Sequence, residues 1–365
     1  VIPSAKVQVK NQRTGIERTV TANEQGRYII TNLAPAQYTV SSTASGLGTT
    51  EVEVALTAAQ ERTVNLALQP AVLQQEITVS GGELVVIDLS SARIGANINE
   101  REVSTLPLNG RQLSQLYLLA PGAQTAGGGS FDNIRFSGRA NQQNAVRYDG
   151  IEGSAVIDSS PGNLNGESST GFRLQSSLEN VQEFRVESSN YPAEYGTGSA
   201  GQISVVTKSG GNDLHGALFE YVRNNALDAR NFFDGSSKSP LRLNQFGGSV
   251  GGPIIKNRTF FFASYEALRQ RAGVNIIEAV PSAAARARAV SSIAPLMAAY
   301  PSGGIATSNP DLDLFRLAAS NRIDENYGSI RLDHRFNDKY SITARYFRDQ
   351  GEAIAPLNVT GNYQL

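Results

Sequence analysis

The segment SVVTK (residues 204–208) ends a glycine-punctuated run, and the segment DLHGALFEYVR (residues 213–223) follows it almost directly. The second segment alternates apolar and polar residues, and its apolar side chains share one face: Ala217, Phe219 and Tyr221. Such alternation has the period of a β-strand, because successive side chains point to opposite faces of a sheet. The order predicts a globular region that leads directly into a sheet of long strands.

Further segments show the same period. We expect strands at Leu243–Gly252 and Thr259–Leu268, and a hairpin from Ile330–Phe336 to Tyr340–Tyr346. One face of the hairpin is apolar, and the other carries charged residues: Arg331, Asp333, Arg335 and Arg345. A soluble antiparallel sheet alternates in the same way, and its charged face lies in water. In a barrel, the charged face would line the lumen and could form ion pairs with a plug.

The connections between these strands are alternately long and short. Residues 224–242 and 270–325 form long connections, whereas residues 253–257 and 337–339 form tight turns. Outer-membrane barrels combine long external loops with brief periplasmic turns, and a strand of roughly ten residues spans a bilayer core when tilted. We therefore expect the first part of a membrane barrel. Plugged barrels close with about twenty-two strands, so residues 212–365, with about five, should not form a stable barrel alone.

Several motifs, in their order along the chain, resemble the TonB-dependent outer-membrane receptors, particularly the Oar-like group with an N-terminal carboxypeptidase-regulatory-like domain. The resemblance covers nearly the whole chain. The motifs are Leu106-Pro107-Leu108-Asn109-Gly110-Arg111 followed by Ala120-Pro121-Gly122, Arg147-Tyr148-Asp149-Gly150, Tyr191-Pro192-Ala193-Glu194-Tyr195-Gly196, Val206-Thr207-Lys208-Ser209-Gly210 and Asn244–Pro253. Each motif alone is weak, but their joint occurrence in this order is specific.

The resemblance and the composition shifts predict a mainly β protein of three parts. Residues 1–70 would form a prealbumin-like, carboxypeptidase-regulatory-like β-sandwich, residues 71–211 the TonB box and an α+β plug domain, and residues 212–365 the N-terminal part of a transmembrane β-barrel. In the first part we expect strands at Lys6–Lys10, Glu17–Thr21, Tyr28–Thr31, Gln37–Ser41, Thr50–Leu56 and Thr63–Leu68. This part contains no histidine, so it lacks the ligands that a zinc peptidase needs.

In the plug region (residues 71–211) we expect short helices around Gln112–Leu119 and Leu178–Gln182. By the resemblance, glycine-rich loops at residues 122–133 and 154–171 would face the external ligand. The GGG segment at 127–129 lacks the lysine and the strand-to-helix setting of a P-loop, which favours a plain loop.

A short β-prone segment precedes the plug. It consists of Glu76, Ile77, Thr78, Val79 and Ser80, between Gln69-Pro70 and Gly81-Gly82. Such a segment can add a strand to the edge of another protein's sheet. By the resemblance it is a TonB-box candidate, whose partner would be the TonB-type energy-transducing protein in the periplasm. The other interpretation is that the segment forms the first strand of the plug.

The composition excludes several classes of site. The chain has no cysteine, which removes disulfides and thiolate chemistry, and its net charge of -1 gives no electrostatic case for nucleic-acid binding. It contains no apolar run long enough for a transmembrane helix. It begins at Val1 within what looks like a strand, so we expect that sequence has been lost before it.

Candidates for catalysis are few. His215 and His334 are far apart and lack metal-ligand spacing, which favours packing roles. Glu179 and Glu183 are four residues apart and would share a helical face, but carboxylates bonded to backbone or to arginines are the better interpretation. We expect no enzyme activity, no cofactor and no metal.

The function that the resemblance implies is that of an outer-membrane receptor and transporter. An external ligand would bind the loops and the plug, and force from the inner-membrane complex would displace or partly unfold the plug. The alternative is an adhesion or structural surface protein in the outer membrane that uses residues 270–325 and the N-terminal domain as contact modules. The outer-membrane lipid would surround the strands in either case.

Overall fold

The computed structural model describes residues 1–58, 60–70, 93–108, 111, 113–125, 134–152, 176–193, 195–196, 198–230, 238–337 and 340–354. The protein is mainly β, as predicted. The chain forms two compact units. The first comprises residues 1–218, 248–265 and 327–348, and the second comprises residues 219–247, 266–326 and 349–365.

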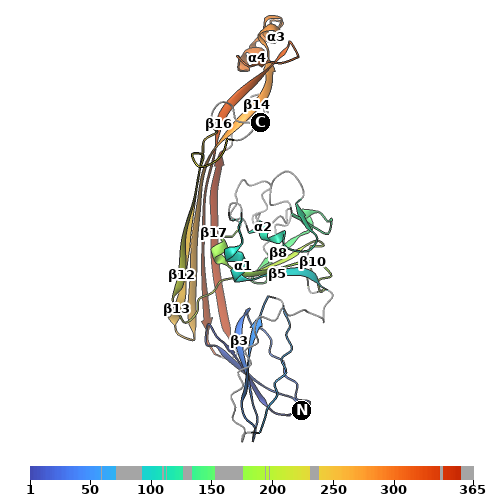
Figure 1. Ribbon diagram of the computed structural model, residues 1–365, viewed down its shortest axis with the longest axis vertical. Coiled ribbons are helices and arrows are strands. Elements are labelled where there is room, and N and C mark those ends of the chain that lie inside the picture. The colour runs from blue at the N-terminus through green and yellow to red at the C-terminus, as the bar shows by residue number, and fades with distance from the viewer. Residues whose placement is uncertain are drawn as a thin grey trace. The chain divides into compact units, whose positions relative to one another are not determined.

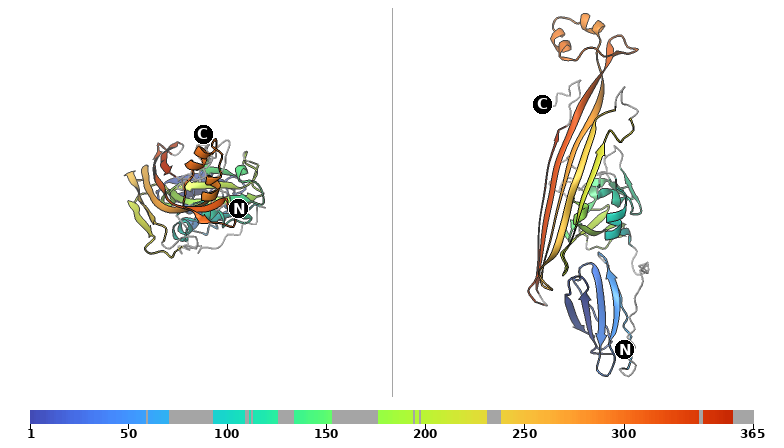
Figure 2. Two further views of the ribbon diagram at one scale, coloured as in Figure 1. Left: turned by 90° about the horizontal axis from the view of Figure 1, so that it is seen from above. Right: turned by 60° about the vertical axis from the view of Figure 1, so that its left-hand side comes forward.

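The N-terminal part of the first unit is built on one antiparallel sheet. Its strands are β1 (Lys6–Asn11), β2 (Glu17–Thr21), β3 (Ala36–Thr43) and β4 (Thr50–Leu56), in the order β2-β1-β3-β4, and the right-hand view of Figure 2 shows them in blue. Alternate apolar residues form its core: Val7, Val9, Tyr38, Val40 and Val54. The period of two read from the sequence is therefore confirmed for these four strands.

Two expected strands of this part are irregular instead. Residues 28–31 and 63–68 make no strand, yet Tyr28, Ile30, Val64 and Leu66 pack against the apolar face of the sheet. The Tyr28 hydroxyl donates to the Val64 carbonyl at 2.8 Å, which links the two segments. The layer that covers the sheet is thus held by side chains rather than by a second hydrogen-bonded ladder.

The plug region contains a mixed sheet. Its strands are β5 (Ile94–Ile98), β8 (Ala145–Tyr148), β9 (Ile151–Glu152), β10 (Val181–Ser189) and β11 (Gln202–Thr207), in the order β5-β10-β11-β8-β9. Only the β11–β8 pair among these is parallel. A separate ladder joins β6 (Ala123–Thr125) to β7 (Ile134–Phe136). The buried Phe184 and Tyr117 rings meet edge to face at 5.4 Å in the core.

The helices of the plug region differ in part from the expectation. Helix α2 (Ser114–Tyr117) confirms the helix expected around residues 112–119. The segment at 178–182 forms only a 3₁₀ turn, η3 (Leu178–Asn180), because β10 begins at Val181. Helix α1 (Glu100–Thr105) was not expected, although its capping box, Asn99 with Glu102, is readable in the sequence.

The long strands form one sheet, in which β12 (His215–Asn224), β13 (Leu241–Ile255), β14 (Thr259–Pro281), β16 (Leu312–Arg335) and β17 (Ser341–Ile354) are neighbours in this order. Figure 1 shows them side by side. The short β15 (Ile305–Ala306) also pairs with β16. On β16 the alternation is as predicted, with Ile330 and Leu332 exposed and Arg331 between them largely covered. No helix in the described ranges is long and apolar enough to cross a membrane.

The prediction of a long connection over residues 270–325 is wrong in its length. Strand β14 continues to Pro281 and β16 begins at Leu312, so the connection shrinks to residues 282–311. Polar residues made these strand ends look like a loop. Charged side chains can pair across these strand ends: both Nη atoms of Arg271 donate to the Asp324 carboxylate, at 2.7 and 2.9 Å.

The connection at 282–311, in the second unit, is itself folded around one arginine. It contains helices α3 (Ala283–Ala287) and α4 (Ala294–Ala299), and Ser282 caps α3 by accepting from the Ala285 amide. The Arg286 guanidinium donates to the carbonyls of Pro281, Tyr300, Pro301 and Met297. These bonds tie the two helices to the end of β14.

Candidate functional site

The site begins at the turn between β8 and β9, where Asp149 and Gly150 have left-handed φ values of 49° and 84°. Aspartate tolerates this conformation better than most residues, and glycine adopts it without strain. The Asp149 amide donates to the Val205 carbonyl at 2.9 Å, which fixes the turn against β11. The RYDG motif therefore specifies a turn that presents one carboxylate.

Thr207, at the end of β11, binds this carboxylate twice. Its amide donates to Asp149 Oδ1 at 2.8 Å and its hydroxyl donates to Oδ2 at 2.6 Å. Two residues from separate sequence motifs are thus brought together, because β11 and β8 are parallel neighbours.

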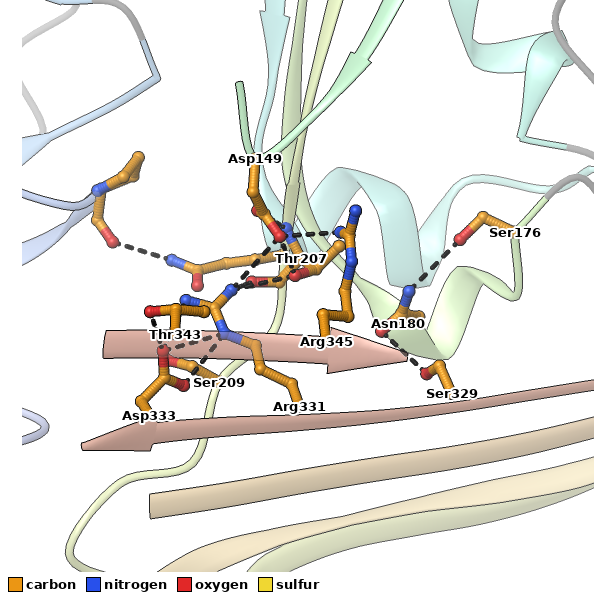
Figure 3. Close-up of polar contacts among 12 residues, drawn as sticks. Asp149, Ser176, Asn180, Thr207, Ser209, Ser329, Arg331, Asp333, Thr343 and Arg345 are labelled. Carbon is orange, nitrogen blue, oxygen red and sulfur yellow. Dashed lines mark hydrogen bonds and ion pairs between the residues drawn. The ribbon is translucent and has the colours of Figure 1, made fainter. Parts of the chain in front are cut away.

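Two arginines from the long strands meet the same carboxylate (Figure 3). Arg345 of β17 donates from Nη1 to Asp149 Oδ2 at 2.7 Å, and Nη1 of Arg331 of β16 lies 3.6 Å from that oxygen. Arg331 Nη1 also donates to the Thr207 carbonyl and hydroxyl oxygens, at 3.0 and 2.9 Å. The predicted ion pairs between the charged face of the hairpin and the plug region are confirmed for these two arginines.

Asp333 balances the charge of the cluster. Its carboxylate accepts from Nε and Nη2 of Arg331 at 2.9 and 3.0 Å, and from the Thr343 hydroxyl at 2.7 Å. The side chains of the four charged residues are only 12–21% exposed. We call Asp149, Thr207, Arg331, Asp333 and Arg345 the Asp149 latch.

A neutral contact joins the same parts of the chain near η3. Asn180 donates from Nδ2 to the Tyr327 hydroxyl at 3.2 Å, and its Oδ1 accepts from the Ser329 hydroxyl at 3.2 Å. Ser329 in turn lies 2.7 Å from Ser264 on β14. Figure 3 shows Asn180 and Ser329 beside the latch. Sequence reasoning missed this contact, because neither residue stands out by periodicity.

Aromatic rings support Arg345. Its guanidinium lies 5.7 Å from the centre of the Tyr148 ring and 5.6 Å from that of Phe347, which is within range for cation–π attraction. Burial raises the pKa of Tyr148, so its hydroxyl stays neutral. The latch is therefore held by charge pairing on one side and by ring faces on the other.

The other predicted plug-motif residues serve separate local contacts. Arg111 pairs with Glu179 at 2.9 Å, and Lys208 pairs with Glu100 at 3.4 Å. The Tyr195 ring, next to Gly196, packs edge to face on Tyr191. Leu106, Pro107 and Leu108 directly follow α1, outside the latch. Asn109, Gly110, Glu194 and the box candidate at 76–80 lie outside the described residues.

Glu179 and Glu183, the two carboxylates considered for catalysis, bond to an arginine and to a backbone amide, as we expected. They do not share a helical face, because Glu179 lies in η3 and Glu183 lies on β10. Glu183 lies on β10, where its carboxylate accepts from the Ala58 amide of the N-terminal part. Burial raises the pKa of Glu183 to about 7. His215 Nδ1 lies 2.9 Å from the Asp213 carbonyl oxygen, and His334 Nδ1 lies 2.8 Å from the Thr259 hydroxyl. Within the described ranges no three acidic or imidazole groups cluster as metal ligands would.

Comparison with known families gives two matches. Residues 1–69 match the carboxypeptidase regulatory-like domain, and residues 206–309 match the outer membrane beta barrel domain. The chain is 26% identical over 273 residues to the TonB-dependent transporter Oar of Myxococcus xanthus, an alignment that covers 68% of this chain. The alignment takes in 24% of that relative, so the chain spans about a quarter of its length.

Solved receptor structures show a looser likeness. The siderophore receptor PirA of Acinetobacter baumannii matches with a TM-score of 0.46 and 17% identity, over 72% of this chain and 32% of that one. A mutant of the ferric enterobactin receptor PfeA of Pseudomonas aeruginosa, in complex with enterobactin, matches with a TM-score of 0.45 and 14% identity, over 72% of this chain and 34% of that one.

The two domain matches agree with the mainly β fold. The chain is therefore a homologue of the TonB-dependent transporter Oar that combines a carboxypeptidase regulatory-like domain with residues of an outer membrane beta barrel domain, and these matches indicate a bacterial outer-membrane protein.

Proposed function

We propose that this protein is the receptor of a TonB-dependent transport system, which binds an external ligand and admits it by energised displacement of the plug. The Asp149 latch is the observation that carries this proposal. It joins the plug to the strands through the buried Thr207 and through four charged side chains that are 12–21% exposed. Water can replace such contacts when they open, whereas an apolar contact would expose hydrocarbon.

The hydrogen bonds of the Asp149 latch are weak enough for an external force to break them. A hydrogen bond to a charged group contributes about 1.5–3 kcal/mol when buried and less when water reaches it. Asp149 accepts three such bonds, from the Thr207 amide, the Thr207 hydroxyl and Arg345. The latch therefore holds the plug in place at rest, and the free energy needed to open it is one that an external energy source can supply.

That source is proposed to be a TonB-type protein in the periplasm. The sequence of the plug region contains no P-loop, so we propose that the energy comes from outside this chain. The segment Glu76–Ser80 is the proposed contact, because a short β-prone segment can add a strand to a partner's sheet. We also propose that the three domains span residues 1–70, 71–211 and 212–365. We further propose that the protein has no catalytic activity and needs no cofactor.

The test is capture of the full chain by the periplasmic domain of the TonB protein of the source bacterium. Ile77→Pro removes a backbone donor from the proposed added strand and should abolish capture. Val72→Pro, which introduces the same residue ahead of the segment, is the matched control and should leave capture unchanged. Equal capture of all three proteins, or of none, contradicts the proposal.

The second candidate function, adhesion or a structural role at the cell surface, is favoured by one observation. The folded connection at 282–311 exposes large apolar side chains: Val290, Ile293 and Leu296. Exposed apolar groups on a folded loop can form a contact surface. If deletion of residues 283–310 abolishes surface adhesion and leaves uptake unchanged, this second function is supported over transport.

A further inference from the structure

A cavity lies within the first unit, where the hairpin between β1 and β2 meets the end of the plug and the strands β14, β16 and β17. Its volume is about 210 Å³. A single water needs roughly 10–15 Å³ in this measure, so the cavity has room for a small hydrated molecule. The cavity adjoins the Asp149 latch, and Arg331 and Asp333 contribute to both.

The lining of this cavity is strongly cationic. It contains five arginines and one carboxylate: Arg13, Arg18, Arg258, Arg331 and Arg335, with Asp333. Asp333 is already engaged, because it accepts both Nε and Nη2 of Arg331. The cavity therefore carries an excess of positive charge.

Arg13, Arg18 and Arg258 each donate to a neutral oxygen. Arg13 donates to the carbonyl and hydroxyl oxygens of Ser209 at 3.0 and 2.6 Å, and Arg18 donates to the Thr31 carbonyl at 2.8 Å. Arg258 Nε donates to the Arg335 carbonyl at 3.2 Å. A guanidinium has five N–H donors, so each of these side chains keeps donor capacity beyond the bonds it makes here.

The position of Arg13 makes the excess charge costly. Burial lowers the pKa of Arg13, the charge of Glu100 opposes that change, and the nearby charge of Arg331 adds to it. A guanidinium nevertheless stays charged in proteins, so like charges face one another in a partly enclosed space. An anion in the cavity would relieve this repulsion.

We propose that the cavity binds a compact oxyanion of the phosphate or carboxylate type, held by Arg13, Arg18 and Arg258. The planar fork of a guanidinium matches such oxygens, and charge-assisted hydrogen bonds are the strong ones. Arg13 and Arg18 come from the N-terminal part, and Arg258 comes from the turn between β13 and β14. A bound oxyanion would therefore link the N-terminal part to the long strands, close to Ser209, where the chain leaves the plug region.

The test uses the full chain in detergent micelles and titrates it with inorganic phosphate by calorimetry. Saturable binding of one phosphate per chain is expected. Arg18→Gln and Arg258→Gln should each weaken it about tenfold, which corresponds to the loss of one charged contact. Arg258 is exposed, so its substitution leaves the fold intact. Arg27→Gln, an exposed arginine of the same domain that does not line the cavity, is the matched control and should bind as the native chain does.

A second arm separates a free anion from a lipid headgroup, which offers the same chemistry. Phosphate should raise the thermal midpoint of the native chain and of Arg27→Gln, but not that of the double variant Arg18→Gln/Arg258→Gln. Absence of phosphate binding, binding that survives both substitutions, or stabilisation only by micelles that contain phosphatidylglycerol would each overturn the proposal of a free oxyanion.

Discussion

Replacing Asp149 with alanine tests the latch most directly. The change removes three hydrogen bonds to a carboxylate and leaves Arg345 without its acidic partner, while Arg331 keeps Asp333. Bonds to charged groups contribute about 1.5–3 kcal/mol each when buried. Because the Asp149 side chain is 21% exposed, we take about 1 kcal/mol for each bond and expect a loss of about 3 kcal/mol.

The assay is native-state hydrogen exchange of the full chain in detergent, read at the amides of β8 and β11. A loss of about 3 kcal/mol should increase their exchange about a hundredfold, whereas the amides of β1 should not change. Asp228→Ala is the control, because it removes an ion pair with the exposed Arg223 and should cost less than about 1 kcal/mol. A change below about threefold at β8 and β11 would show that the carboxylate does not hold the plug.

Three further predictions concern single residues. Burial raises the pKa of Glu183 from 4.5 to about 7, so the folded protein binds its proton more tightly than the unfolded chain does. Stability should therefore fall by about 3 kcal/mol as the pH rises between those two values, and urea titrations of Glu183→Gln should lack this part of the pH dependence. Gly201→Ala would place its Cβ 2.2 Å from Cδ2 of the buried Phe136 and should cost about 1–3 kcal/mol in a urea titration, whereas Gly196→Ala, which meets nothing within 4 Å, should cost little. Arg286→Ala removes the bonds that tie together residues 282–311, so chymotrypsin should cut this connection about tenfold faster, and an unchanged rate would contradict its role.

Alternation along the strands was readable from the sequence, because it depends on one face being covered and the other exposed. Ile330 and Leu332 are exposed while Arg331 is covered, as the pattern predicted. The ends of β14 and β16 were not readable. Arg271 and Asp324 look like loop residues until the register that pairs them is known, since a charged residue is stable in a strand when its partner lies opposite.

The candidate site was readable only in part, for a related reason. The motifs singled out Asp149 and Thr207, and the hairpin pattern singled out Arg331 and Arg345. The sequence predicted that the arginines would form ion pairs with the plug, but it did not identify Asp149 and Thr207 as their partners. Asp149 and Arg345 are 196 residues apart, and a single sequence holds no record of which distant charges pair. The Asn180 contact left no signal, because a lone asparagine before a strand is common in turns.

If the proposed transport function holds, the distribution of apolar and polar contacts favours displacement of the plug over its unfolding. The buried members of the plug core lie between Ile98 and Val205, and in the described part of the chain none of them lies on a long strand. The latch and the Asn180 contact, by contrast, join the plug to β16 and β17 through polar groups. A pull on the plug loads both sets of contacts. Separating the latch exposes groups that water can bind at once, whereas opening the core costs about 25 cal/mol for each Å² of apolar surface that is exposed. The polar contacts should therefore yield first, and the sheet of β5, β10, β11 and β8 should leave the strands as an intact body.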